Sequence, residues 1–122
     1  MRENVVKQKS FDFAVKVVSI CQKIIHEQKE FDIGRQFLRS GTAVGALIRE
    51  AEHAESKRDF IHKLAIAQKE CNETIYWIEL LIKAENQYSE ELKPLNENAV
   101  ELMKLLTAIL VSAKQNQRRS RH

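Results

Sequence analysis

Apolar residues recur every three or four positions along most of the chain, which is the spacing of one face of an α-helix. Four successive segments carry this pattern, and none shows the strict alternation expected of a β-strand. The four apolar stripes are Phe13, Val17, Ile20 and Ile24; Ile33, Phe37, Gly41, Val44, Ile48 and Ala51; Phe60, Leu64, Ala67, Cys71, Thr74, Ile78 and Leu81; and Leu92, Leu95, Ala99, Leu102, Leu106, Ile109 and Ala113. The pattern therefore predicts four helices.

Polar residues that favour helix starts divide these segments. The expected capping residues are Ser10, Asp32, Ser56 and Ser89. Ser56 has an acid, Asp59, three residues on, which is the spacing of a capping box. We expect the first helix to fade over residues 26–29 and the third to end at about Glu85. Pro94 lies close enough to the start of the fourth helix to be tolerated.

Short connections between long helices favour antiparallel neighbours, so we predict an all-α, up-down-up-down antiparallel four-helix bundle. The chain has 122 residues, and we assign 1–122 to a single domain with a basic C-terminal tail at 114–122. With 3 glycines and 1 proline, the sequence lacks the turn residues that a β-sandwich or barrel needs.

Apolar residues exceed what one face of each helix requires. The additional positions are Ala14, Val18, Cys21 and Ile25; Ile61, Ala65, Ile75 and Ile82; and Val100, Met103 and Leu110. They favour self-association through a lateral apolar surface. The alternative is a broad, well-filled core within one bundle.

Two glycines interrupt the predicted second helix. Gly41 and Gly45 lie four residues apart and so share one face. Each costs about 1 kcal/mol relative to alanine within a helix. A close approach of another helix explains this cost best, and a local kink is the alternative.

Charge is distributed unevenly along the chain. The net charge is +3, and residues 114–122 contain four cations and no acid. Such a tail is typical either of a nucleic-acid contact or of a solvated helix end that suits the helix dipole. The mixed-charge stretch 49–63 is either a solvated connection or part of a polar ring around an oligomer axis. The candidate phosphate-contacting residues are Arg35, Arg39, Arg49, Lys57, Arg58, Lys63, Lys69, Arg118, Arg119 and Arg121.

Candidate chemistry is sparse. Glu50 and His53 have the Glu-x-x-His spacing of di-iron bundles, but such a site needs the motif twice, so we expect an ordinary hydrogen-bonded or solvent-facing pair. Cys21 and Cys71 lie within apolar patterns and are interpreted as reduced core thiols. No nucleophilic triad or phosphate-binding loop is recognisable. We expect no enzyme activity, no metal or other cofactor, no secretory leader and no membrane span, which places the protein in the cytoplasm.

Three stretches together resemble a known bacterial family. They are FLRSGTAVGALIREA at 37–51, DFIHKLAIAQKECNET at 59–74 and YWIELL at 76–81. They resemble the four-helix-bundle family named for intervening sequences of 23S ribosomal RNA genes, often labelled the S23 ribosomal protein family. The sequence is also similar to the accessory variability protein of diversity-generating retroelements, a pentamer that binds nucleic acid and a reverse transcriptase. The family usually has asparagine where this chain has Leu47.

The resemblance implies a homopentamer of antiparallel bundles. Residues that match recurrent family positions, and that the resemblance assigns mainly to packing and subunit contact, are Arg39, Glu50, Phe60, Lys69, Glu73 and Trp77. From the residues and the resemblance together, the leading hypothesis is a non-enzymatic oligomer that binds RNA or DNA through backbone electrostatics. The rival hypothesis is an oligomeric scaffold or adaptor that binds a protein partner and no nucleic acid.

Overall fold

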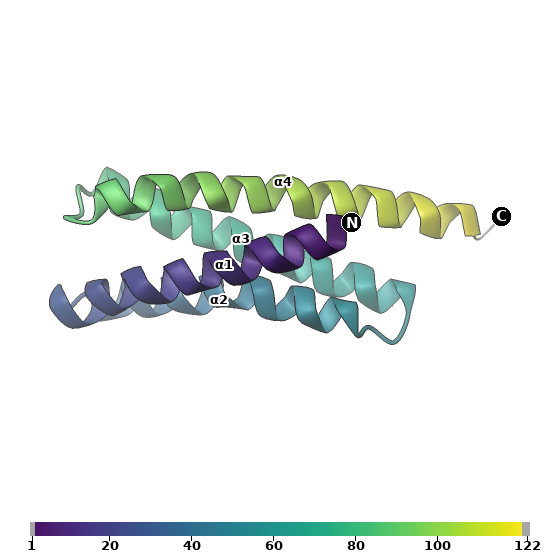
Figure 1. The fold of residues 1–122 in the computed structure, drawn as a ribbon, viewed down its shortest axis with the longest axis horizontal. Coiled ribbons are helices and arrows are strands. Elements are labelled where there is room, and N and C mark those ends of the chain that lie inside the picture. The colour runs from purple at the N-terminus through teal and green to yellow at the C-terminus, as the bar shows by residue number, and fades with distance from the viewer. Residues whose placement is uncertain (1, 121–122) are drawn as a thin grey trace.

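The computed structural model describes residues 2–120, which form four long α-helices (Figure 1). These are α1, Arg2–Gln22; α2, Phe31–Glu52; α3, Lys57–Lys83; and α4, Ser89–Ser120. A π-helical turn, η1, Lys23–Glu27, continues α1 into the first connection. The prediction of an all-α fold with four helices is confirmed for residues 2–120.

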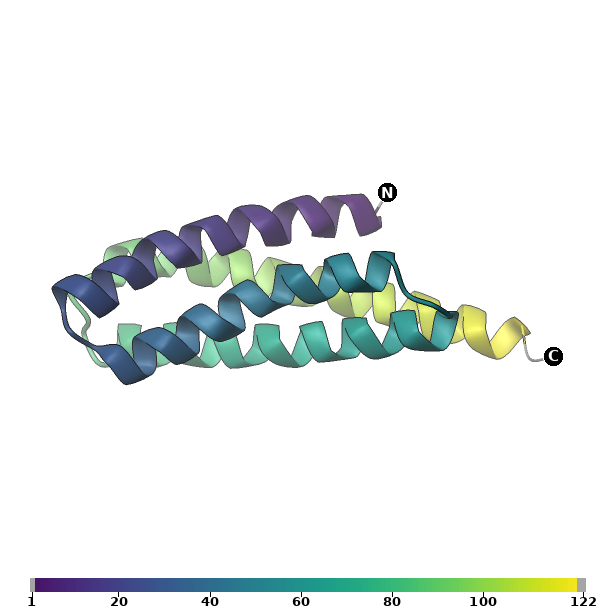
Figure 2. The same cartoon turned by 90° about the horizontal axis from the view of Figure 1, so that it is seen from below.

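The helices run up, down, up and down around one core (Figures 1 and 2). Each helix packs against two neighbours, namely α1 on α2 and α4, and α3 on α2 and α4. All of the predicted fourth stripe is buried, as are Phe37, Leu64 and Ile78 at the centre of the second and third. Leu110, which the sequence placed among the surplus residues, also lies in this core.

The expected start of the first helix is wrong. Ser10 lies inside α1, is 1% exposed, and donates a hydrogen bond from Oγ to the carbonyl of Lys7 at 3.0 Å. Val6, 1% exposed, lies two turns before Phe13 on the same apolar face and packs residues 2–10 of α1 against the core. The helix therefore begins near the N-terminus because its apolar face extends that far.

The other helix ends lie close to their expected positions. Glu30, rather than Asp32, caps α2, since its carboxylate accepts from the backbone N–H of Ile33 at 3.4 Å. Ser56 caps α3 as expected, accepting from the N–H of Asp59 at 3.0 Å. The backbone leaves the helical region at Lys29 and Glu85, with φ of 63° and 59°, and these residues lie in the two connections at the same end.

The glycines of α2 mark a close contact with α1. A Cβ added at Gly41 would lie 2.7 Å from Cγ1 of Val17, and one added at Gly45 would lie 3.3 Å from the carbonyl oxygen of Ser10. The close-approach interpretation is therefore confirmed. Ser10 is small and buried because the backbone of α2 passes next to it at Gly45.

We predict that Gly45→Leu destabilises the protein by about 1–3 kcal/mol, because the larger side chain meets the backbone of α1 and forces the helices apart. Urea denaturation at neutral pH measures the change. Ala46→Leu is the matched control, since Ala46 is the next residue and is exposed. Equal midpoints for the two variants would contradict the close contact.

Candidate nucleic-acid interface

The predicted phosphate-contacting residues occupy different parts of the bundle. Arg35 lies in the first turns of α2, whereas Arg39 and Lys69 lie further along the sides of α2 and α3. The others gather where α1 begins, α2 and α4 end, and α3 begins, which we call the open end (Figure 2). Its predicted members are Arg49, Lys57, Arg58, Lys63, Arg118 and Arg119. Arg121 lies outside the described residues.

Arg39 is held in an ion-pair network between α2 and α3. Its Nη1 donates to Oε2 of Glu70 and its Nη2 to Oε2 of Glu73, both at 2.7 Å. The same oxygen of Glu73 accepts from Nε1 of Trp77 at 3.1 Å. The hydrogen bond from Trp77, joined by that from Arg39, holds the pKa of the Glu73 carboxyl below its usual range. Arg39 therefore joins two helices, and its charge is largely neutralised within the protomer.

Three other predicted cations also have partners within the protomer. The guanidinium of Arg35 lies 5.5 Å from the ring centre of Phe31, and that of Arg49 lies 5.1 Å from that of Phe11. Lys63 pairs with Glu50 at 3.2 Å. The aromatic rings do not neutralise the charges of the two arginines, whereas Glu50 neutralises the charge of Lys63.

Four predicted cations at the open end have no ion pair or side-chain hydrogen bond within residues 2–120. They are Lys57, Arg58, Arg118 and Arg119, and all four are exposed. Arg2 and Lys114 also lie at the open end and are exposed. Sequence reasoning missed Arg2 because the first helix was expected to begin eight residues later, which left Arg2 without a defined position.

The two ends of the bundle differ in charge. At the open end, residues 2–7, 49–63 and 110–119 hold nine cations and five acids. At the other end, residues 23–35 and 79–93 hold five cations and seven acids. Glu50 and Glu52 are each paired with a lysine, and the Asp59 carboxylate accepts from the N–H of Glu55 at 3.3 Å. The open end thus presents a positive potential, which favours an anionic partner.

The sites considered for catalysis or metal binding have ordinary roles. Glu50 of the Glu-x-x-His pair binds Lys63, and His53 is exposed at the end of α2. Across residues 2–120, no three His, Cys, Asp or Glu side chains come together in a group suited to a metal ion. Cys21 and Cys71 are free and buried, and burial raises the pKa of both thiols to about 12. Neither thiol is therefore activated as a nucleophile.

Large apolar side chains are exposed on two different sides of the bundle. Phe11, Val15 and Val18 follow one another at helical spacing on α1 and are 49%, 56% and 38% exposed. On the side formed by α3 and α4, Tyr76 is 57% and Val100 is 37% exposed. We call these the α1 face and the α3–α4 face. Some of the surplus apolar residues thus remain accessible after the bundle has formed.

In the part of the chain that the structure covers, no helix combines the length and the apolar character that a membrane span requires. The fold and its charged end define the chain as an antiparallel four-helix-bundle protein with one basic end. The family model described as 23S rRNA-intervening sequence protein matches residues 2–108, and the chain belongs to this family.

A solved structure supports the same assignment. The chain is similar to a protein of unknown function from the S23 ribosomal protein family of Bacteroides thetaiotaomicron VPI-5482, with 52% sequence identity and a TM-score of 0.86. The similarity covers 90% of this chain and 98% of the other. A search among curated proteins gives no match. The basic end of α4, including Lys114, Arg118 and Arg119, lies beyond the residues that the family model matches.

We predict that Glu73→Gln lowers the free energy of unfolding by about 1 kcal/mol at pH 7, a figure discounted for the exposure of Arg39. Folding lowers the pKa of Glu73 below its ordinary value of 4.5. The Glu73 carboxylate therefore makes its full contribution to the free energy of unfolding above pH 4.5, and that contribution disappears as the pH falls through the lowered pKa of the folded protein. Urea denaturation from pH 7 to pH 3 measures both effects.

Glu79→Gln is the matched control, because Glu79 is an exposed acid on the same helix. A destabilisation by Glu73→Gln that stays constant down to pH 3, or that equals the effect of Glu79→Gln, would contradict the network.

Proposed function

We propose that this protein binds RNA or DNA through the phosphate backbone, without catalysing a reaction, and that it acts as a homo-oligomer. The observation that carries the proposal is the group of exposed cations at the open end that have no ion pair within residues 2–120. Cations that already have carboxylate partners gain little from a phosphate, because the existing pair must first be broken. The unpaired residues Lys57, Arg58, Arg118 and Arg119 carry no such cost.

The shape of the open end suits a phosphate backbone. Lys57 and Arg58 lie at the start of α3, and Arg118 and Arg119 lie near the end of α4. In Figure 2, α4 extends past the start of α3, so cations are presented along a helix as well as at the bundle end. Phosphates along a strand match such a row, and contacts of this kind position a nucleic acid without reading its sequence.

The family supports an RNA-related role. Its name refers to the intervening sequences of 23S ribosomal RNA. The RNA contact itself is our proposal for this chain, because the similar structure from Bacteroides thetaiotaomicron belongs to a protein of unknown function.

The proposed oligomer is a homopentamer, as the resemblance implies, and the exposed apolar faces support self-association. The α1 face and the α3–α4 face lie on different sides, because α1 does not contact α3 in residues 2–120. Two different faces favour a heterologous contact, in which one face of a protomer meets the other face of the next, and such contacts form a ring where the rotation between protomers closes. A ring multiplies the basic ends and so strengthens binding to a long polyanion.

The cytoplasm is the proposed location. Cys21 and Cys71 are buried thiols without a disulfide, as expected where thiols are kept reduced.

The second candidate function is that of an adaptor, which the exposed Tyr76 and Val100 favour because they offer apolar area to a protein partner.

We predict that the protein binds short RNA and duplex DNA with an affinity that falls steeply between about 50 and 200 mM salt. Replacing Arg58, Arg118 and Arg119 by glutamine removes three phosphate contacts. It should therefore weaken binding and make the slope of log affinity against log salt shallower by about 2–3. Fluorescence anisotropy of labelled nucleic acids measures both quantities.

The control replaces three exposed lysines away from the open end by glutamine, namely Lys29, Lys83 and Lys104. This variant should retain most of the affinity for nucleic acid. If both triple variants lose affinity equally, the contact is not at the open end. If the unmodified protein binds neither nucleic acid at low salt, the adaptor function replaces the proposal.

We predict that the protein has the mass of about five 14.2 kDa chains in light scattering and that Val15→Glu shifts it toward the monomer. The new charge is buried if the α1 face is an interface, and an unpaired buried charge is strongly unfavourable. Gln36→Glu adds the same charge at an exposed position of α2 and should leave the mass unchanged. A monomeric unmodified protein would contradict the proposed oligomer.

A further inference from the structure

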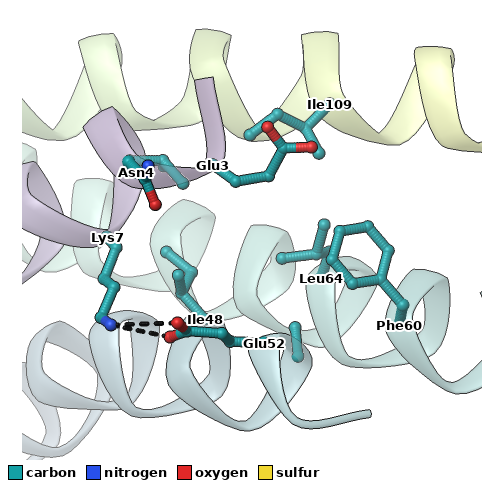
Figure 3. A pocket seen from close by; sticks show the side chains of 10 residues that line it. Glu3, Asn4, Lys7, Ile48, Glu52, Phe60, Leu64 and Ile109 are labelled. Atoms are coloured by element: carbon teal, nitrogen blue, oxygen red, sulfur yellow. Dashed lines mark hydrogen bonds and ion pairs between the residues drawn. The ribbon is translucent and has the colours of Figure 1, made fainter. Parts of the chain in front are cut away.

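A cavity of about 210 Å³ opens at the open end, among α1, α2, α3 and α4 (Figure 3). Its floor consists of buried apolar side chains, namely Val6, Ile48, Ala51, Leu64 and Ile109. The ring of Phe60, half-buried, forms part of one wall. An engineered apolar cavity of about 150 Å³ admits benzene, so this cavity has room for a flat aromatic ring.

The mouth of the cavity carries polar groups of two kinds. Lys7 and Glu52 form an ion pair at 2.8 Å on one side, so their charges satisfy each other. On another side lie Glu3 and Asn4, which the close-up places above Ile48 and Leu64, with the Glu3 carboxylate beside Ile109 (Figure 3). Within residues 2–120, the side chains of Glu3 and Asn4 have no ion pair and no hydrogen bond. A free carboxylate and a free amide thus border an apolar cavity.

The cavity continues into a second hollow that carries cations. This hollow, of about 390 Å³, shares Glu3, Phe60 and Ile109 with the first and adds Arg2 and Lys57. A planar group in the cavity would therefore lie next to positive charges on the outside. This combination of an aromatic wall, hydrogen-bonding groups and neighbouring cations matches the parts of a nucleotide, which has a flat base and an anionic phosphate.

We propose that the cavity receives one unpaired base of a single-stranded nucleic acid, while the adjacent phosphates contact Arg2 and Lys57. This inference rests on the proposed nucleic-acid binding and narrows it to strands with unstacked bases. Bases inside a duplex are stacked and paired, so their faces do not reach such a cavity. The base replaces water over the apolar floor and lies against Phe60.

The carboxylate of Glu3 gives the site a base preference. A carboxylate is an acceptor only, so it needs N–H donors on the base. Cytosine, adenine and guanine carry an exocyclic amino group, and acidic side chains accept from the amino group of cytosine. Uracil and thymine present one N–H between two carbonyl oxygens, which repel the carboxylate. The site therefore favours bases with an amino group.

The test compares short oligocytidylate and oligouridylate of equal length by fluorescence anisotropy, because the two carry the same number of phosphates. The unmodified protein should bind oligocytidylate more tightly by on the order of tenfold. Glu3→Gln should bring this ratio close to one. The same variant should bind oligouridylate no more weakly than before, since it removes a negative charge close to the phosphates.

Phe60→Leu tests the aromatic wall and should weaken both single strands several-fold, leaving a duplex of the same charge unaffected. Phe31→Leu is the matched control, because Phe31 is an exposed aromatic residue at the start of α2, at the opposite end of the bundle. It should change neither the ratio nor the affinity. Thermal unfolding checks that each variant remains folded.

Two results would overturn the inference in different ways. Salt-dependent binding with equal affinity for oligocytidylate, oligouridylate and duplex would remove the base site and leave the proposed backbone contact in place. If Glu3→Gln left the ratio of the affinities for oligocytidylate and oligouridylate unchanged, this result would also exclude the base site. Absence of binding to any of the three at low salt would overturn the proposed function and the base site together.

Discussion

The close contact between α1 and α2 determines how the rest of the molecule is arranged. Gly45 lets the backbone of α2 pass next to Ser10, and Gly41 makes room for Val17. This contact keeps the first turns of α1 against the bundle, so that Val6 enters the core and Glu3 and Asn4 reach the open end. The cavity at that end exists because α4 continues past it while α2 ends and α1 and α3 begin there (Figure 2).

The charged residues of this protein serve two purposes that the structure separates. Some cations join helices, as Arg39 does through Glu70 and Glu73 along the side of the bundle and Lys63 does through Glu50 at the open end. At the open end, no carboxylate within residues 2–120 pairs with Lys57, Arg58, Arg118 or Arg119. The composition of the stretch 49–63, in which both signs are mixed, conceals this difference. A near-neutral protein thereby acquires one basic end and keeps more acids than cations at the other.

The apolar spacing predicted most of the core, because the burial of one face governs a helix wherever it packs. The pattern gave the wrong role for Ser10. From the sequence alone, a serine that caps a helix cannot be distinguished from a serine that is buried because the backbone of a neighbouring helix passes next to it. Of the ten predicted contact residues, Arg39 and Lys63 proved to be paired within the protomer, which depends on acids thirteen to thirty-four residues away. The cavity was not predictable, because it depends on where four separate helices begin and end in space.

The central claim is that the open end, and no other part of the surface, contacts nucleic acid. Ultraviolet crosslinking of a bound single-stranded RNA, followed by mapping of the crosslinked peptides, tests it without altering the protein. The account predicts crosslinks in residues 2–7, 57–63 and 109–120, with Phe60 among them. Crosslinks confined to residues 23–35 and 79–93, or to the α3–α4 face around Tyr76, would contradict it.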